Sequence, residues 1–298
     1  MRLLDLSHAG ASTPAWAIAF YLASSAGMSI FNKLAISALP LPWTLTGIQM
    51  LFAVAAIGVN WPFVHIGSLR DALRWGCTVP LLFSAMLVSS MIALNHNTLG
   101  TVAVCRNVAP LFPLVIESMF RVPMQVTPGT VGALLTIILG VGLYYSQTLA
   151  LSAVGLAAIG LNLGLAVLER LLQRHLLAQD PVDLSKPALM LLNNAVGVVL
   201  NSLALLTVCW HTEVVDYASA FGRIGGGGCA LVLLSCANGV AISYAGLQVQ
   251  QRVTATTFMV LTNVNKLVVV AFGALAIGET LTPVAAAGVL IATGGALW

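Results

Sequence analysis

Apolar residues fill long segments of the chain almost from end to end, and short segments rich in turn-forming and charged residues separate them. A helix needs about 20 mostly apolar residues to cross the hydrocarbon core of a bilayer. The apolar segments have about this length, so the pattern predicts an all-α membrane protein with ten transmembrane helices. The expected helices cover residues 14–38, 42–59, 75–94, 98–120, 128–145, 152–175, 187–210, 226–247, 253–277 and 281–298.

Composition supports a membrane protein and excludes several other classes. Of the 298 residues, 59% are hydrophobic and only 7% are charged, whereas soluble domains have about 45–50% apolar and about 25% charged residues. The 12 Lys and Arg and the 9 Asp and Glu are too few to solvate a soluble globule or to bind nucleic acid. All five cysteines lie in expected helices without metal-ligand spacing, so we expect them to pack as small apolar residues and expect no metal site.

Basic residues predict how the chain crosses the membrane. Three of the 12 Lys and Arg lie well inside expected helices, eight lie in loops or at helix ends on the side that holds the N-terminus, and only Arg223 falls on the other side. Because cytosolic loops carry an excess of Lys and Arg, we expect both termini to be cytosolic. The same alternation favours ten spans over nine or eleven.

A weak internal repeat divides the chain into two halves. A shift of 155 residues aligns Thr127 and Pro128 with Thr282 and Pro283, and in the same register it aligns the glycines at positions 140 and 295. Five spans is an odd number, so the two halves are expected to have opposite orientations in the bilayer. Inverted repeats are typical of secondary transporters, whose substrate site lies near the midplane between the halves. We therefore expect one transporter domain over residues 1–298, with repeats at about 13–149 and about 152–298.

Four ionisable residues stand out within the expected helices, namely Lys33, Arg106, Glu117 and Lys266. A charge at the bilayer centre costs about 2.5–3.5 kcal/mol on insertion scales, so such residues usually face the bundle interior or an aqueous cavity. Lys33 and Glu117 lie near helix ends, where anchoring at the membrane surface is an equally good interpretation. Arg106 and Lys266 lie deeper and are the stronger candidates for a binding site.

Amide and hydroxyl side chains accompany the deep cations. Thr262 and Asn263 precede Lys266 by four and three residues and share one helix face with it. Asn193 and Asn194 lie midway along the seventh expected helix, where their alternative role is to hold helices together through hydrogen bonds. A cavity lined by amides and cations suits a solute that carries both hydrogen-bonding edges and phosphate.

Enzymatic motifs are missing from the sequence. It contains no HExxH or GxSxG motif and no pair of intramembrane carboxylates, so an intramembrane enzyme would have no visible catalytic centre. The glycine run at 225–228 lacks the Lys-Ser/Thr of a phosphate-binding loop and is interpreted as a linker. We therefore expect a protein that is not an enzyme and that uses no cofactor.

Polar residues of the first and fourth expected helices resemble those of a known family. Arg106 and Asn107, with Glu117 further along, are similar to a Lys-Asn pair followed by Glu in the Golgi GDP-mannose transporters. Through nearly its whole length the chain resembles the nucleotide-sugar and triose-phosphate translocators of the drug/metabolite transporter superfamily. In the first helix the family pattern Tyr-x-x-Ser-Ser-x-x-Met-x-x-x-Asn-Lys is matched by Tyr21, Ser24, Ser25, Met28, Asn32 and Lys33.

Two signature motifs of that subfamily are matched in their polar members. The segment Leu-Leu-Asn-Asn at 191–194 stands where the subfamily has Phe-Tyr-Asn-Asn, associated with the nucleotide base, and Thr-Asn-Val-Asn-Lys at 262–266 stands where it has Gly-Ala-Leu-Asn-Lys, associated with sugar and phosphates. Ser243 matches a base contact, and Phe258 replaces a tyrosine. The substrate site that this resemblance implies consists of Tyr21, Arg106, Asn193, Asn194, Ser243, Phe258, Thr262, Asn263, Asn265 and Lys266.

The resemblance implies an antiporter that carries GDP-mannose or another GDP-sugar into the Golgi lumen in exchange for GMP, by alternating access. The partners it implies are these substrates, membrane lipid and, in a homodimer, a second copy of the chain. A plastid-type triose-phosphate or sugar-phosphate translocator is one alternative, although Leu267 stands where that group is expected to have a second cation beside Lys266. A non-transporting membrane scaffold or chaperone is the other, although it would not need cations at depth in both halves.

Overall fold

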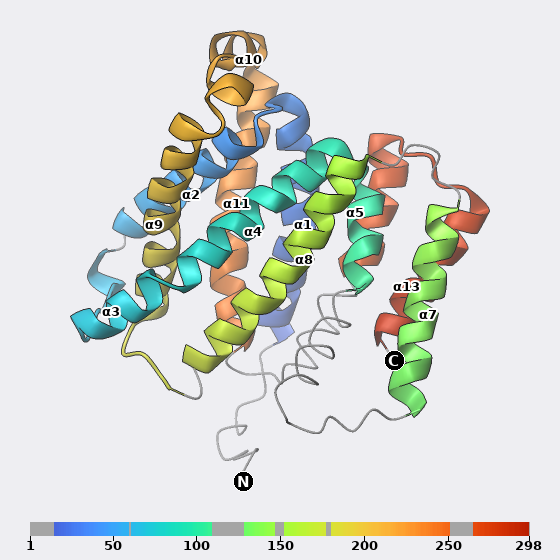
Figure 1. Cartoon of the computed structure of the whole chain (residues 1–298), viewed down its shortest axis with the longest axis horizontal. Coiled ribbons are helices and arrows are strands. Elements are labelled where there is room, and N and C mark those ends of the chain that lie inside the picture. The colour runs from blue at the N-terminus through green and yellow to red at the C-terminus, as the bar shows by residue number, and fades with distance from the viewer. Residues whose placement is uncertain are drawn as a thin grey trace.

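The computed structural model describes residues 15–59, 61–108, 128–146, 152–176, 180–250 and 265–297. Within these ranges the regular structure is helical, apart from an isolated antiparallel bridge between Ile66 and Leu184 (Figure 1). The main helices are α1 (Ala15–Ala38), α2 (Pro42–Val59), α3 (Leu69–Gly76), α4 (Val79–His96), α5 (Leu99–Cys105), α7 (Pro128–Tyr145), α8 (Ala153–Arg174), α9 (Lys186–Thr207), α10 (Tyr217–Arg223), α11 (Gly226–Gln250), the Asn265–Ile277 helix and α13 (Pro283–Leu297). Shorter 3-10 or π-helical turns are η1 (Trp61–Phe63), η2 (Arg106–Val108), η4 (Trp210–Val214) and η5 (Gly273–Ile277).

Several of these helices are long and apolar enough to cross a membrane. The five clear candidates are Pro42–Val59, Leu69–His96, Ala153–Arg170, Lys186–Thr207 and Gly226–Val249. Shorter apolar helices cover Gly132–Tyr144, Asn265–Ile277 and Pro283–Gly295. The chain is therefore an all-helical, multi-pass membrane protein, as the apolar pattern predicts.

The third expected helix differs from the prediction at its start. Instead of one helix from residue 75, α3 ends at Gly76 and α4 begins at Val79. Pro80 lies in the first turn of α4, where its missing N–H costs nothing, but it would break the hydrogen-bond ladder of a helix continuing from α3. The remainders of the fourth and ninth expected helices, at 109–120 and 253–264, lie outside the described residues.

Helices pack mainly across the two expected halves. The four most extensive pairs are α1 with α11, α2 with α9, α4 with α8, and α7 with α13 (Figure 1). Each pair joins a helix that precedes residue 150 to one that follows it. The interior of the bundle is therefore an interface between the N-terminal and C-terminal parts of the chain.

Glycines bring α7 and α13 into backbone contact. A Cβ atom added at Gly140 would lie 2.2 Å from the backbone nitrogen of Ala292, and one added at Gly295 would lie 2.9 Å from the backbone oxygen of Ala133. Small residues at helix interfaces allow this close approach in membranes. The two glycines aligned by the internal repeat, Gly140 on α7 and Gly295 on α13, therefore each allow close contact with the backbone of the partner helix.

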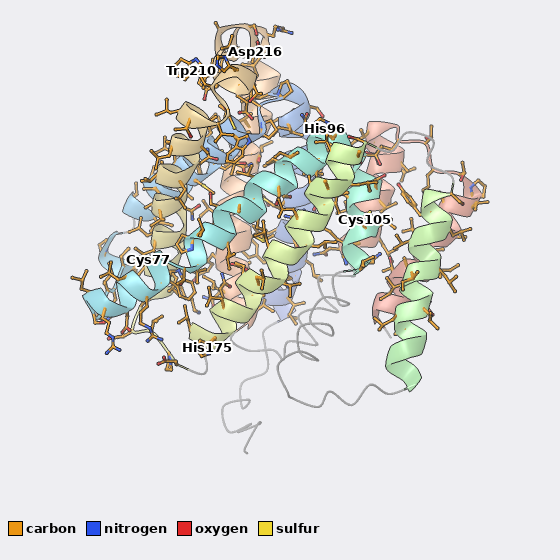
Figure 2. The ribbon with its side chains drawn as sticks, viewed as in Figure 1. Cys77, His96, Cys105, His175, Trp210 and Asp216 are labelled. Atoms are coloured by element: carbon orange, nitrogen blue, oxygen red, sulfur yellow. The ribbon has the colours of Figure 1, made fainter. Side chains whose placement is uncertain are left out.

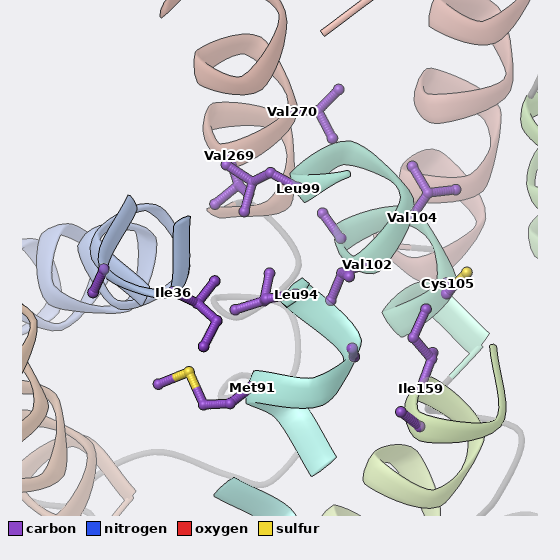
Figure 3. Close-up of a cluster of buried hydrophobic side chains, with 14 of the residues drawn as sticks. Ile36, Met91, Leu94, Leu99, Val102, Val104, Cys105, Ile159, Val269 and Val270 are labelled. Atoms are coloured by element: carbon purple, nitrogen blue, oxygen red, sulfur yellow. The ribbon is translucent and has the colours of Figure 1, made fainter. Parts of the chain in front are cut away.

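The largest apolar cluster lies where α1, α4, α5 and the Asn265–Ile277 helix meet. Ile36, Leu94, Leu99 and Val269 are almost fully buried there (Figure 3). This cluster fixes α5 beside the Asn265–Ile277 helix. Arg106 directly follows α5, and Lys266 lies on the Asn265–Ile277 helix.

The two ends of the bundle are named here by the short helices they hold. The α10 end also contains the first residues of α2 and α5, and the α3 end contains the segment 180–185 (Figure 1). At the α3 end Nη2 of Arg74 donates to Oδ2 of Asp180 at 2.5 Å. This hydrogen bond and the charge of Arg74 hold the pKa of the Asp180 carboxyl below its ordinary value of 3.8.

Candidate functional site

Arg106 is held by polar side chains from two other helices. It follows Cys105, the last residue of α5, which lies well inside the bundle between the two ends (Figure 2). Its guanidinium Nη2 donates to Oγ of Ser90 on α4 at 2.7 Å and to Oδ1 of Asn162 on α8 at 3.2 Å. Both partners are neutral, so they orient the guanidinium without neutralising its charge.

Asn162 is the residue that connects Arg106 to the scaffold. The side chain is only 5% exposed, and its Nδ2 donates to the backbone oxygen of Met86 at 2.7 Å and to Oγ of Ser89 at 3.4 Å. A buried amide must satisfy donors and acceptor together, and here the donors bind α4 while the acceptor binds Arg106. The packing of α8 on α4 therefore determines where the guanidinium lies.

Lys266 meets Arg106 directly. The Nζ of Lys266 donates to the backbone oxygen of Arg106 at 3.0 Å, which brings together two predicted site residues from opposite halves of the chain. Arg106 also acts electrostatically on Lys266. Both side chains are half-buried. Two like charges in this environment repel each other, and a bound anion would relieve the repulsion.

Arg170 is a third cation within electrostatic range of this place, with an exposed side chain, and the sequence pattern did not reveal it. It lies on α8 and interacts electrostatically with Arg106, Lys266 and the phenol of Tyr21. The preceding residue, Glu169, is buried and accepts a hydrogen bond from Nε2 of Gln173. The term cation cluster is used below for Arg106, Arg170 and Lys266.

A signal for Arg170 was present in the sequence. Asn162 and Arg170 are eight residues apart on one helix, so they project on neighbouring faces about two turns apart. Counting Arg170 among the basic residues of a cytosolic loop hid this relation, because a charge near a helix end fits either role.

Two buried amides beside the cluster have unused hydrogen-bonding capacity. Nδ2 of Asn265 and Oδ1 of Asn107 have no hydrogen-bond partner among the residues that the structure describes, although both side chains are at most 5% exposed. Asn265 precedes Lys266 and Asn107 follows Arg106. The Nδ2 group of Asn107 donates to Oγ1 of Thr293 on α13 at 3.5 Å. Buried polar atoms are normally satisfied, so each of these amides keeps one group that is available to a polar ligand.

Asn193 and Asn194 make their described hydrogen bonds away from the cation cluster. Oδ1 of Asn193 accepts from Nε1 of Trp75 on α3 at 2.8 Å, and Nδ2 of Asn194 donates to the backbone oxygen of Met190 at 2.8 Å. Both side chains are buried on α9. The bond to Trp75 fixes the amide of Asn193 so that its carbonyl side faces the indole.

The remaining predicted residues divide into two groups. Tyr21 is buried against Ala245 and Val249 of α11, and its interaction with Arg170 places it near the cation cluster. Ser243 lies on α11, where its Oγ donates to the backbone oxygen of Gly239 at 2.8 Å. Phe258, Thr262 and Asn263 of the site, and the intramembrane Glu117, lie outside the described residues.

Comparison with known proteins identifies the family of this helical membrane protein. Residues 14–298 match the Triose-phosphate Transporter family. A GDP-mannose transporter of Arabidopsis thaliana is 27% identical over 286 residues, covering 91% of this chain and 73% of the relative. A GDP-fucose transporter of the same plant is 25% identical over 283 residues, covering 92% of this chain and 81% of the relative. The chain therefore belongs to the Triose-phosphate Transporter family, and it is a multi-pass membrane transporter rather than an enzyme.

Proposed function

We propose that the protein is a nucleotide-sugar antiporter that exchanges a GDP-sugar, GDP-mannose or a close analogue, for GMP by alternating access. The observation that carries this proposal is the cation cluster, with Nζ of Lys266 3.0 Å from the backbone oxygen of Arg106. The names of the two plant relatives favour a GDP-sugar over other phosphorylated solutes. At 27% and 25% identity the sugar itself is left to experiment.

The cation cluster would bind the phosphate groups of the substrate. A pyrophosphate cannot enter a cavity of low dielectric without compensating charge, because its desolvation cost is prohibitive. Arg106 offers a planar guanidinium already oriented by Ser90 and Asn162, and Lys266 offers a flexible ammonium. Arg170 adds a third charge, which suits a diphosphate better than an uncharged solute.

The rest of the substrate would contact side chains from four parts of the chain. In this proposal Asn193, Asn194 and Ser243 contact the edge of the guanine base. Because the carbonyl of Asn193 is occupied by Trp75, its Nδ2 group is the part that would face a base acceptor. Tyr21, Phe258, Thr262, Asn263 and Asn265 would contact ribose, phosphate or sugar groups.

Two inverted repeats of five spans would form the carrier. If the spans are numbered from one to ten along the chain, the packed pairs are one with eight, three with six, two with seven and five with ten. Exchange of the two halves turns the first pair into the second and leaves the other two unchanged, as expected when the halves are related by a two-fold axis. The distribution of basic residues supports cytosolic termini, and the resemblance to Golgi GDP-mannose transporters supports a Golgi location.

Exchange in proteoliposomes tests the function and the site together. Vesicles loaded with GMP are supplied with labelled GDP-mannose, GDP-fucose, a UDP-sugar or triose phosphate. We expect GDP-sugar uptake that depends on internal GMP. Truncation of one partner of a close charge pair typically costs about 2–5 kcal/mol, so Lys266→Ala is expected to lower GDP-sugar exchange roughly 30-fold or more.

The matched control is Arg223→Ala, because Arg223 is exposed on α10, where its Nε donates to the backbone oxygen of Ser219 at 3.0 Å. It should retain exchange close to that of the unmodified protein. Full exchange by Lys266→Ala would overturn the assignment of the site. Exchange of triose phosphate without any GDP-sugar would replace the proposed substrate with that of the rival translocator class.

A further inference from the structure

Two hydrogen-bonded contacts connect α5 to the Asn265–Ile277 helix, one at each end. At the end near Arg106, Lys266 donates to the Arg106 backbone oxygen. At the α10 end, Oε1 of Glu279 accepts from the backbone nitrogen of Leu99 at 2.5 Å, and Oε2 accepts from that of Gly100 at 2.9 Å. The two helices are therefore antiparallel neighbours, fastened at both ends.

Three glycines allow the carboxylate of Glu279 to reach the start of α5. Gly278 adopts a left-handed conformation with φ of 77°, which turns the chain directly after η5 and which other residues rarely adopt. A Cβ at Gly273 would lie 2.7 Å from Oε2 of Glu279, and one at Gly100 would lie 3.3 Å from the same atom. Glycine at both positions leaves room for the carboxylate at the start of α5, where exposed N–H groups and the helix dipole favour an anion.

A second carboxylate at the α10 end has a different relation to the site. Oε1 of Glu213 accepts from the backbone nitrogen of Trp43, and Oε2 accepts from the backbone nitrogen and Oγ1 of Thr44, all at 2.8–2.9 Å. It caps α2, which packs along α9, and neither of these helices carries a member of the cation cluster. Glu213 therefore serves as a structural comparison for Glu279.

We propose that α5 and the Asn265–Ile277 helix form a gate over the cation cluster, and that Glu279 is the positioning residue that holds this gate shut at the α10 end. Arg106 directly follows α5 and Lys266 lies on the Asn265–Ile277 helix, so separating the two helices at the α10 end opens a path to the site from that side. A phosphate bound between the cations would compete with the Arg106 carbonyl for the ammonium of Lys266. A bound substrate therefore weakens the contact between Lys266 and Arg106. The contact of Glu279 with the start of α5 is then the one that keeps the two helices together.

The relation of Lys33 to Glu279 fits the same account. The Nζ of Lys33 donates to the backbone oxygens of Leu94 and Asn97, both at 2.7 Å, at the end of α4, where a cation is favoured by the helix dipole. Lys33 also interacts electrostatically with Glu279. The attraction of this fixed cation favours the carboxylate in its place at the start of α5, which stabilises the closed arrangement.

Thiol labelling measures the opening without any substrate. Val102 lies on α5 one turn from the Glu279 contact and is 2% exposed. In a full-length background with the five native cysteines replaced, Val102→Cys is treated with a membrane-impermeant maleimide in detergent micelles. We expect Glu279→Gln, which keeps only one acceptor oxygen, to raise the labelling rate about tenfold, because charge-assisted hydrogen bonds that favour the closed state are lost.

Two further variants separate gating from folding. Gly100→Ala leaves the charge of Glu279 in place but puts a Cβ 3.3 Å from its Oε2 and 2.8 Å from the Tyr144 hydroxyl, so it should raise labelling as well. Glu213→Gln removes acceptors of the same kind from α2, so it should lower thermal stability but leave Val102→Cys protected. Unchanged labelling in both Glu279→Gln and Gly100→Ala, or an equal rise in Glu213→Gln, would overturn the proposal.

This inference rests on the proposed function only in one respect, namely that the gate controls the access of a transported substrate. Because labelling requires no transport, the two proposals fail separately. A rise in labelling without exchange of any tested solute would retain the gate and refute the assigned substrate. Exchange of GDP-sugars with unchanged labelling would retain the assigned substrate and refute the gate.

Discussion

Replacement of Gly140 by alanine tests whether α7 and α13 are in backbone contact. The new Cβ would lie 2.2 Å from the nitrogen and 2.7 Å from the Cα of Ala292, and 2.7 Å from the oxygen of Gly288, whereas ordinary contacts begin at 3.4 Å. All three neighbours are backbone atoms, which cannot rotate away. The helices must therefore separate by about 1 Å, and overpacking of this kind costs typically about 1–3 kcal/mol.

The expected effect is measurable as a fall in apparent melting temperature. Because 1 kcal/mol corresponds to roughly 2–4 °C in a domain of about 150–250 residues, a cost of about 3 kcal/mol predicts a decrease of roughly 6–12 °C for Gly140→Ala. The assay is thermal unfolding in detergent micelles, followed by intrinsic fluorescence at a fixed scan rate, since membrane proteins often unfold irreversibly.

Gly142 provides a matched control on the same helix. A Cβ at Gly142 would have no atom within 4 Å, so Gly142→Ala makes the same chemical change without the clash. We expect its melting temperature to equal or slightly exceed that of the unmodified protein, because alanine favours helix over glycine. If Gly140→Ala and Gly142→Ala melt within about 1 °C of each other, the close packing of α7 on α13 is refuted.

Two further predictions concern the cation cluster and the α3 end. Asn162→Leu keeps the branched shape of the side chain but removes the acceptor of Arg106. Because a hydrogen bond to a charged group is worth about 1.5–3 kcal/mol, the KM for exchanged GMP should rise roughly tenfold or more. An unchanged KM would show that Asn162 does not position the guanidinium. The pKa of the Asp180 carboxyl is lowered by Arg74, so the stabilisation from this pair is fully present above pH 3.8 and is lost as pH falls through the lowered pKa. The difference in melting temperature between the unmodified protein and Arg74→Ala should therefore be constant from about pH 8 to about pH 5 and should decrease in more acidic buffer. If this difference in melting temperature varies between neutral pH and about pH 5, the assignment to Asp180 is contradicted.

Local patterns predicted the helices well because their cause is local. A run of apolar residues near 20 residues long has few alternatives in a bilayer. The described ends of α1, α2, α4, α7, α8, α9, α11 and α13 lie within about one turn of the expected positions, whereas α10 and most of α3 were not expected. The exception at Cys77 and Thr78 also has a local cause, since Pro80 follows two residues later. That proline was visible, but its effect depends on where α3 ends.

The candidate site was predictable in part. Arg106 and Lys266 were identified because each is a cation deep within an apolar segment, and the structure brings them together. Arg170 was not identified, because a cation near a helix end is equally compatible with a loop. Its place in the cluster depends on how α8 packs on α4, and no local pattern specifies that packing.

Long-range contacts of buried polar groups were beyond sequence reasoning. Glu279 binds the start of α5 from about 180 residues away, and Glu213 binds the start of α2 from a similar separation. Both glutamates lie in short segments between helices, where a carboxylate is unremarkable in the sequence. Only the arrangement of the helices shows that each caps a helix of the other half.

The central claim is that the cation cluster binds phosphate groups, and calorimetric titration of the purified protein with GMP and with guanosine tests it most directly. The two ligands share the base and ribose, so their difference in affinity isolates the phosphate. We predict that the unmodified protein binds GMP at least about tenfold more tightly than guanosine, and that Lys266→Ala and Arg170→Ala each reduce this ratio. Equal affinity for the two ligands in the unmodified protein, or a ratio that survives in Lys266→Ala, would contradict the account.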